Sequence, residues 1–248
     1  MGLRELARRL VYGSKDSSET YVEHLRSLGM VIGDNTVIYS PTHCIIDATR
    51  PWMIEIGRNV SITEGVTILT HGYDWSVFKG KYGDVLGSAG HVRIGDNVFI
   101  DMNSTILKGV EIGDNVIIGA GSVVTKDIRA NSVAVGVPCR VIDDIDSYLE
   151  KRRAAQVDEA ADLYNCWRRN SFEGRRKEIP PREIFSEFFW LFEEGKPGNL
   201  SCDEYERMLA LCGTYDKSAA LFDTTERPFV NYREFLGHLD RIIAGWQE

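Results

Sequence analysis

One histidine occupies a position at which its chemistry could be used. His71 ends the run Ile68-Leu69-Thr70 and is followed by a long insertion that extends to Gly90. An imidazole titrates near neutral pH, so it can take a proton from a hydroxyl group as a general base. Insertions that interrupt a rigid framework are also common places for binding sites. These residues predict a general base at His71; the alternative is a polar residue that caps the last corner of the framework.

The framework that must position His71 is a repeat of six residues. Isoleucine or valine recurs at a strict interval of six, at Ile94, Ile100, Ile106, Ile112, Ile118 and Val124. This interval fits neither the 3.6-residue turn of a helix nor the simple alternation of a strand. It is typical of a hexapeptide repeat wound into a β-solenoid. Three hexads predict one triangular coil of eighteen residues, and the coils should stack at about 4.8 Å.

The repeat extends over much of the first half of the chain. It begins at Ile32, slips near Pro51, breaks across 71–91 and fades near Pro138, which gives roughly four to five coils. Asparagines recur where a corner could need the left-handed backbone region, which asparagine tolerates well. These are Asn35, Asn59, Asn97 and Asn115.

Helical patterns flank the repeat. Ser17 to Tyr21 could begin a helix that places Tyr21, Val22, Leu25 and Leu28 on one face. From Asp143 onward the pattern predicts amphipathic helices, and the segment 184–192 is too aromatic for a solvent-facing helix. Its Phe188-Phe189-Trp190 cluster is expected in a core, with a docking surface as the alternative. The turn around Gly195 lacks the Asp-rich pattern of an EF-hand.

Composition narrows the class of protein. The chain has 248 residues and a net charge of −8, which argues against general binding to nucleic acid. No long uncharged apolar run predicts a transmembrane segment. Glu5 and nearby arginines interrupt the N-terminal apolar residues, so we expect no signal peptide. Five cysteines without a CxxC pair predict reduced thiols in a cytoplasmic protein.

The stretch from Ile94 to Ile142 resembles the left-handed β-helix acyltransferases with hexapeptide repeats, among them galactoside, maltose and polysaccharide O-acetyltransferases. The resemblance rests on Ile118-Gly119-Ala120-Gly121-Ser122-Val123-Val124-Thr125-Lys126-Asp127-Ile128 and on Ala134-Val135-Gly136-Val137-Pro138-Cys139-Arg140-Val141-Ile142. It implies an all-β, left-handed parallel β-helix that forms a homotrimer, with active sites between subunits and acetyl-CoA along the solenoid. We therefore expect an N-terminal helical segment over 1–30, the β-helix acyltransferase domain over 31–142 and a C-terminal α-helical region over 143–248.

The resemblance also implies roles for single residues. His71 resembles the family's general base, and the form Thr70-His71-Gly72-Tyr73-Asp74-Trp75 looks more like the polysaccharide-modifying branch. Positions that contact CoA in the family are matched by Ala120, Thr125, Lys126 and Arg140. Two positions depart from the sugar-acetyltransferase pattern, because Phe99 stands where a tryptophan is common and Met102 where a serine is common. Met102 is nevertheless expected on the CoA wall.

Acceptor contacts are expected in the insertion. Tyr73, Trp75, Phe78 and Tyr82 could stack against a sugar or could instead fix the insertion to a neighbouring subunit. We expect substrate contacts from Asp74, Trp75 and Tyr82. Asp74 and Glu64 are also the candidate carboxylates for orienting the imidazole.

The expected function is an acetyl-CoA-dependent O-acetyltransferase that modifies a hydroxyl group of a sugar or polysaccharide precursor. N-acetylation of an amino sugar and a non-catalytic trimeric scaffold are the alternatives. A zinc enzyme on the same fold, as in γ-type carbonic anhydrases, would need three histidine ligands from adjacent subunits. In that class two of the ligands are separated by only a few residues. His71 and His91 are twenty apart, so no metal is expected.

Overall fold

The computed structural model describes residues 10–169 and 179–246. The chain divides into two compact units, Met1–Tyr148 and Leu149–Glu248. The first nine residues of the expected N-terminal helical segment lie outside the described residues. Each unit has a hydrophobic core of its own. Within the described residues, no helix combines the length and the apolar character that a bilayer span needs.

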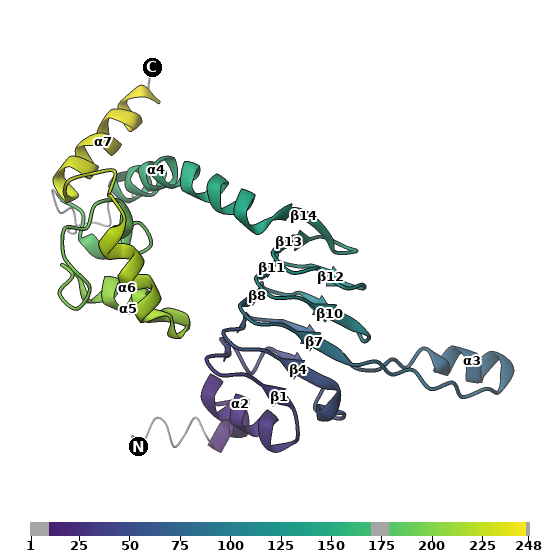
Figure 1. Ribbon diagram of the computed structural model, residues 1–248. Coiled ribbons are helices and arrows are strands. Elements are labelled where there is room, and N and C mark those ends of the chain that lie inside the picture. Colours follow the sequence, from purple (N-terminus) through teal and green to yellow (C-terminus); the bar gives the residue numbers. More distant parts are fainter. Residues whose placement is uncertain (1–9, 170–178, 247–248) are drawn as a thin grey trace. The chain divides into compact units, whose positions relative to one another are not determined.

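Strands between residues 31 and 144 form three sheets that make up the faces of a solenoid (Figure 1). The first sheet contains β1 (Val31–Ile32), β4 (Ile54–Ile56), β7 (Val92–Ile94) and β10 (Val110–Ile112). The second contains β2 (Val37–Ile38), β5 (Ser61–Ile62), β8 (Val98–Ile100), β11 (Val116–Ile118), β13 (Ser132–Val135) and β14 (Arg140–Asp144). The third contains β3 (Ile45–Ile46), β6 (Thr67–Ile68), β9 (Thr105–Ile106) and β12 (Val123–Val124). Neighbouring strands pair in parallel except β13 and β14, which confirms the predicted parallel solenoid.

The register of strand pairing matches the coil of eighteen residues predicted from three hexads. Val92 pairs with Val110 and Ile94 with Ile112, so partners in regular coils are 18 positions apart. Ile54 pairs with Val92, 38 positions away, because the insertion adds residues to that coil. The six hexad residues from Ile94 to Val124 point inward and are at most 3% exposed. The repeat therefore sets both the coil length and the core.

Asparagines make the corners as predicted. All four expected residues have a positive φ, between 54° and 57°. The side chain of Asn97 donates to Oδ1 of Asn115 at 2.8 Å, and that of Asn115 donates to Oδ1 of Asn131 at 2.9 Å. Asparagine thus supplies the backbone conformation of the corner and also bonds one coil to the next.

Two excursions leave the solenoid at the same corner of adjacent coils. The chain needs only residues 107–109 to pass from β9 to β10. After β3 the same corner takes residues 47–53, which include the 3-10 turn η2 (Pro51–Met53). After β6 it takes residues 69–91, which project from the coils and carry α3 (Trp75–Tyr82) (Figure 1). Because β3 pairs with β6, the two excursions begin next to each other.

The N-terminal segment covers the first coil. The 3-10 turn η1 (Gly13–Lys15) leads to α2 (Ser18–Ser27), whose Tyr21, Val22 and Leu25 are buried as predicted. The prediction for Leu28 is wrong, because the helix ends at Ser27 and Leu28 is 41% exposed.

Three side chains of this segment bond the backbone of the first coil, one on each sheet. The guanidinium of Arg26 donates to the carbonyls of Ile32 and Gly33, both at 3.0 Å. Nζ of Lys15 donates to the carbonyl of Cys44 at 2.9 Å, and the N–H of Ile38 donates to Oγ of Ser18 at 2.9 Å. Backbone groups at the end of the solenoid are therefore satisfied by side chains of this segment.

The second unit is helical, as predicted. It is built from α4 (Ile145–Arg169, which begins in the first unit), η3 (Arg182–Phe185), η4 (Phe189–Leu191), α5 (Asp203–Ala210), η5 (Leu211–Gly213), α6 (Tyr215–Thr224) and α7 (Tyr232–Gly245). Its core is aromatic, and Phe189 packs between Tyr205 and Phe222. The core role expected for the Phe188-Phe189-Trp190 cluster therefore holds for Phe189.

Candidate functional site

His71 lies at the base of the projecting insertion. It forms an antiparallel bridge with Ala89, and the N–H of Gly90 donates to the carbonyl of Thr70 at 2.9 Å. The two ends of the insertion are thus joined beside His71, which fixes its backbone to the solenoid. Its side chain is 15% exposed, so one edge of the imidazole remains accessible.

The partner of His71 is Asp47, which the sequence analysis did not identify. Nδ1 of His71 lies 2.7 Å from Oδ2 of Asp47. Asp47 directly follows β3, and its N–H donates to the carbonyl of Ile68 at the end of β6. The stacking of β3 on β6 therefore places the carboxylate beneath the histidine.

The two carboxylates proposed from the sequence for this role are not the partners. Oε1 of Glu64 lies 3.4 Å from Nδ1 of His43 instead. Asp74 is exposed at the start of α3, and its side chain folds back over Gly72. Proximity in sequence favoured these two residues, whereas the actual contact is made between coils. The signal that could have revealed Asp47 is its position directly after the hexad strand paired with the strand before His71.

Hydrogen bonds hold Asp47 in its charged form. Oδ1 accepts from the N–H of Thr49 at 3.0 Å and from its hydroxyl at 2.6 Å. Oδ2 accepts from the N–H and the hydroxyl of buried Thr70 as well as from His71. Burial raises the pKa of the Asp47 carboxyl, but these hydrogen bonds outweigh burial and hold the pKa well below its usual range.

The charge on Asp47 determines the tautomer of His71. An ionised carboxylate can only accept, so Nδ1 must carry the proton that it shares with Asp47. Nε2 is then the nitrogen with the free lone pair. The pair can therefore act as an oriented base that removes a proton through Nε2.

Aromatic residues continue from His71 into the insertion. The ring of Tyr73 meets the imidazole edge-on with centroids 5.0 Å apart, and Trp75 lies 6.2 Å from Tyr73. Tyr82 is at the far end of α3, about 10 Å along the helix axis from Trp75. Lys81 covers its ring at 4.9 Å. Of the candidates for acceptor binding, the structure brings Tyr73 to His71 and Trp75 to Tyr73, whereas Tyr82 lies at the far end of the helix.

The candidate CoA residues lie in and next to the coil formed by β10, β11 and β12, which we call the outer coil. Ala120 and Met102 occupy the same corner on adjacent coils, and the N–H of Gly121 donates to the carbonyl of Met102 at 2.7 Å. Thr125 and Lys126 are exposed just after β12, and the backbone N–H of Cys139, next to Arg140, donates to the carbonyl of β12 residue Val123 at 2.8 Å.

These residues and His71 border one sheet. Thr67, Thr105 and Val123 are paired in register across β6, β9 and β12. His71 follows β6, and Lys126 follows β12 at the corresponding corner. Two strand spacings, about 10 Å along the solenoid axis, separate these corners.

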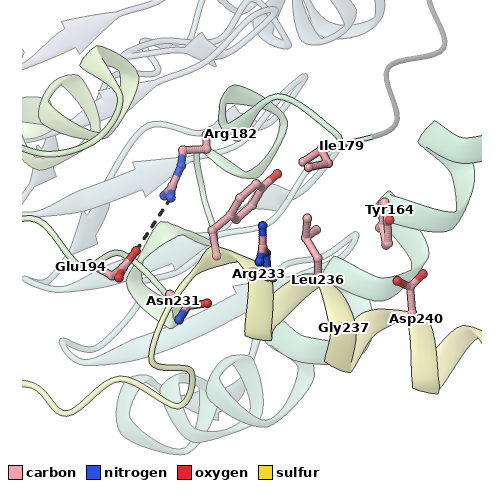
Figure 2. A pocket seen from close by; sticks show the side chains of 10 residues that line it. Tyr164, Ile179, Arg182, Glu194, Asn231, Arg233, Leu236, Gly237 and Asp240 are labelled. Atoms are coloured by element: carbon pink, nitrogen blue, oxygen red, sulfur yellow. Dashed lines mark ion pairs between the residues drawn. The ribbon is translucent and has the colours of Figure 1, made fainter.

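A cavity of about 630 Å³ in the second unit is lined by Tyr164, Arg182, Leu236 and Asp240, among others, and contains none of the residues singled out from the sequence (Figure 2). Across residues 10–169 and 179–246, no three His, Cys, Asp or Glu side chains are grouped as a metal site would require.

Comparison with known proteins places the chain among transferases. Residues 91–126 match the family described as bacterial transferase hexapeptide (six repeats). Protein CapG of Staphylococcus aureus is 40% identical over 129 residues, which are 52% of this chain and 74% of CapG. Galactoside O-acetyltransferase of Escherichia coli K12 is 45% identical over 95 residues, 38% of this chain and 46% of that enzyme.

A solved structure also resembles the chain. A maltose O-acetyltransferase from Clostridium difficile is 34% identical, and the match covers 56% of this chain and 82% of that one with a TM-score of 0.38.

The ionised state of Asp47 predicts a pH dependence of stability. Since its folded pKa is lower than the unfolded value of about 3.9, the carboxylate stabilises the fold above that pH. Its contribution decreases as pH falls below about 4 towards the folded pKa. Asp47→Asn should lower the free energy of unfolding by about 2 kcal/mol at pH 5, with a gap to wild type that narrows towards pH 3. Urea denaturation at a series of pH values measures this gap.

The matched control is Glu64→Gln, which removes an exposed carboxylate that also contacts a histidine. Its gap to wild type should stay within about 0.5 kcal/mol throughout. A gap for Asp47→Asn that is constant or widens on acidification would contradict the ionised assignment.

Proposed function

The chain belongs to the hexapeptide-repeat transferases, and we propose that it is an acetyl-CoA-dependent O-acetyltransferase acting on a sugar or polysaccharide precursor. The observation that carries this proposal is the pair formed by His71 and Asp47, 2.7 Å apart at the base of the insertion. The sequence similarity to galactoside O-acetyltransferase supports a sugar acceptor. We further propose that the coils wind in the left-handed sense of the family.

His71 acts as the general base. Nε2 takes the proton of an acceptor hydroxyl while the hydroxyl oxygen bonds to the thioester carbonyl carbon. Asp47 stabilises the imidazolium that forms and keeps Nδ1 directed away from the reaction. The carbon–sulfur bond then breaks, and the imidazolium returns its proton to the departing thiolate. The products are the acetyl ester and the free thiol of CoA, with His71 restored.

Donor binding falls to the outer coil. CoA carries several phosphate charges, and a protein of net charge −8 must place cations locally to attract it. Lys126 and Arg140 are exposed and supply two such cations, while Ala120, Thr125 and Met102 offer small or apolar contacts to the chain of the ligand. In this arrangement the thioester end extends along the third sheet towards His71.

Acceptor binding falls to the insertion. Tyr73 and Trp75 extend from His71 as an aromatic surface on which a sugar ring can stack. Asp74 is exposed beside them and can accept hydrogen bonds from sugar hydroxyls. Tyr82 is proposed to act at the outer end of α3, where a longer glycan would extend.

A homotrimer is the proposed assembly, with each active site between two subunits. The projecting insertion supports this, because five of its large hydrophobic side chains are more than half exposed. These are Tyr73, Val77, Tyr82, Val85 and Leu86. An insertion with this surface is suited to packing against the flank of a neighbouring solenoid.

An acceptor panel tests the reaction. The protein should release free thiol from acetyl-CoA in the presence of one or more sugars or nucleotide sugars, and mass spectrometry should locate the acetyl group on oxygen. His71→Ala should lower kcat at least about 10²-fold, because general-base catalysis is lost. His24→Ala, on α2 over the first coil and away from the insertion, is the matched control and should retain wild-type kcat. Near-normal turnover by the His71 variant, or acetylation of an amino sugar at nitrogen, would contradict the proposal.

Charge reversal tests the donor site. Lys126→Glu should weaken CoA binding at least about tenfold, because it replaces a cation that faces phosphate by an anion. Arg129→Glu makes the same change on an exposed arginine nearby and should alter the Kd less than about twofold. Calorimetric titration with CoA measures both values. Equal losses in the two variants would remove Lys126 from the site.

Sedimentation tests the assembly. Analytical ultracentrifugation should give a mass three times the 28.0 kDa of the chain. Replacing Val85 and Leu86 together by serine should shift the mass towards that of the monomer, because apolar contact area is lost. A monomer at micromolar concentration for the wild-type chain would contradict the trimer.

A further inference from the structure

The second unit contains an internal duplication with a period of thirty residues. The paired positions share their chemistry: Leu191 and Leu221, Phe192 and Phe222, Glu193 and Asp223, Leu200 and Val230, Ser201 and Asn231, Glu204 and Glu234, Tyr205 and Phe235, Leu209 and Leu239. The aromatic pairs are 0% exposed, so the repeated positions form the core. Each copy ends in a helix, α5 in the first and α7 in the second.

Each copy also contains a loop with the spacing of a calcium-binding EF-hand. In that motif twelve residues separate the helices, with an acidic first ligand, a glycine at position 6 and a bidentate glutamate at position 12. Glu193 to Glu204 and Asp223 to Glu234 are twelve-residue spans that begin and end with a carboxylate. Gly198 is at position 6 of the first loop and has a φ of +86°.

The residues between these ends do not fit a calcium ion. Positions 3 and 5 of the first loop are Gly195 and Pro197, which lack side-chain oxygens. The closing carboxylates bond elsewhere: Glu204 lies 3.0 Å from Arg207, and Glu234 accepts from the N–H of Val230 at 2.8 Å. The carboxylates thus do not converge on one point.

An arginine supplies the positive charge in the first loop. Glu193 is 1% exposed, and its carboxylate accepts from the N–H groups of Gly195 and Ser201. Nη1 of Arg182 lies 3.2 Å from the same carboxylate and donates to Oγ of Ser201 at 2.9 Å. The guanidinium also stacks on Tyr232 at 4.6 Å and extends towards Glu194 (Figure 2). It therefore ties the first loop to the core of the second copy.

An arginine occupies the second loop as well. Arg227 is at position 5, where a calcium loop has a ligand. Its guanidinium lies 3.9 Å from the centre of the Phe222 ring and donates to the carbonyls of Phe222 and Thr225, both at 3.3 Å. The guanidinium thus bonds one carbonyl within this loop, that of Thr225, and one just before it, that of Phe222.

The core between the two copies is filled by a helix from the same chain. Val157, Ala160, Ala161, Tyr164 and Trp167 fall on one face of α4 and pack into the aromatic cluster. Tyr164 meets Phe185 at 6.3 Å, and Arg168 pairs with Asp240 of α7 at 2.6 Å. Calcium-sensing EF-hand pairs expose such a hydrophobic surface only when the metal binds. Here α4 covers the surface while arginines close the loops.

We infer that the second unit is a duplicated helix–loop–helix module that binds the amphipathic helix α4 constitutively, with Arg182 and Arg227 in place of metal ions. This inference is independent of the acetyltransferase proposal, because neither arginine belongs to the catalytic or CoA-binding residues. It makes calcium neither a ligand nor a regulator of this unit.

Calcium addition to the whole chain tests whether calcium binds the second unit or changes the packing of α4. After treatment with EDTA and its removal, calorimetric titration with CaCl2 should give no saturable heat up to about 1 mM, well above the affinity of sensor EF-hands. Hydrogen exchange at the amides of residues 157–167 should be the same with and without calcium. Saturable binding, or calcium-dependent protection of α4, would overturn the inference.

Single substitutions test whether Arg182 and Arg227 hold the loops and thereby keep α4 bound. In Arg182→Gln and Arg227→Gln, hydrogen exchange at residues 157–167 should be at least about tenfold faster than in wild type, because the loops lose their cations. Arg241→Gln, on the exposed side of α7 and outside both loops, is the matched control and should change exchange less than about twofold. Exchange at control rates in both loop variants would overturn the inference. The calcium titration of the wild-type chain decides the metal question even if a variant fails to fold.

Discussion

Stacking of short parallel strands, one coil on the next, is the constraint on which the candidate site depends. Each coil can shift relative to its neighbour only by whole hydrogen-bonded positions, because backbone groups and buried isoleucines must align together. The pairing of Ile46 with Ile68 therefore fixes where the following residues begin. Asp47 and His71 meet because of this alignment, although 24 positions separate them in the sequence. Thr49 and Thr70 then fix the carboxylate by filling its remaining acceptor sites.

The same stacking explains why the solenoid was predictable and part of the site was not. The hexad and the corner asparagines are local patterns, and the core residues follow from their period. The contact with Asp47 depends on a register between coils of unequal length, in which Ile45 pairs with Thr67 rather than with a residue 18 positions on. A regular period cannot reveal that pairing. Glu64 and Asp74 were favoured because they are nearer to His71 in sequence, which carries little weight in a structure built from contacts between coils.

In the helical unit, too, the individual elements were predictable while an arrangement that depends on distant residues was not. Amphipathic patterns predicted its helices, whereas the lack of an Asp-rich loop led the sequence analysis away from the EF-hand spacing of its two loops. The thirty-residue duplication was missed because its loops differ in almost every intervening residue, while the shared positions are common core and capping residues. What the loops have in common is electrostatic, and it involves Arg182 from outside the first loop and Arg227 from inside the second. The replacement of a metal ion by an arginine side chain can be recognised only from the three-dimensional positions of the side chains.

The covering of the first coil by Lys15, Ser18 and Arg26 has a consequence for how copies of this chain can meet. Nothing in a stack of parallel coils limits its length by itself. The backbone N–H and C=O groups of the terminal coil could pair with a strand of another chain just as they would pair with a further coil of the same chain. Side chains that already hydrogen-bond these backbone groups leave them unavailable to another chain, so the stack ends at this edge. Any association of copies that avoids this edge would have to use the flanks of the solenoid. Association of that kind can close into a ring with a fixed number of members, whereas addition at the ends would extend into a filament.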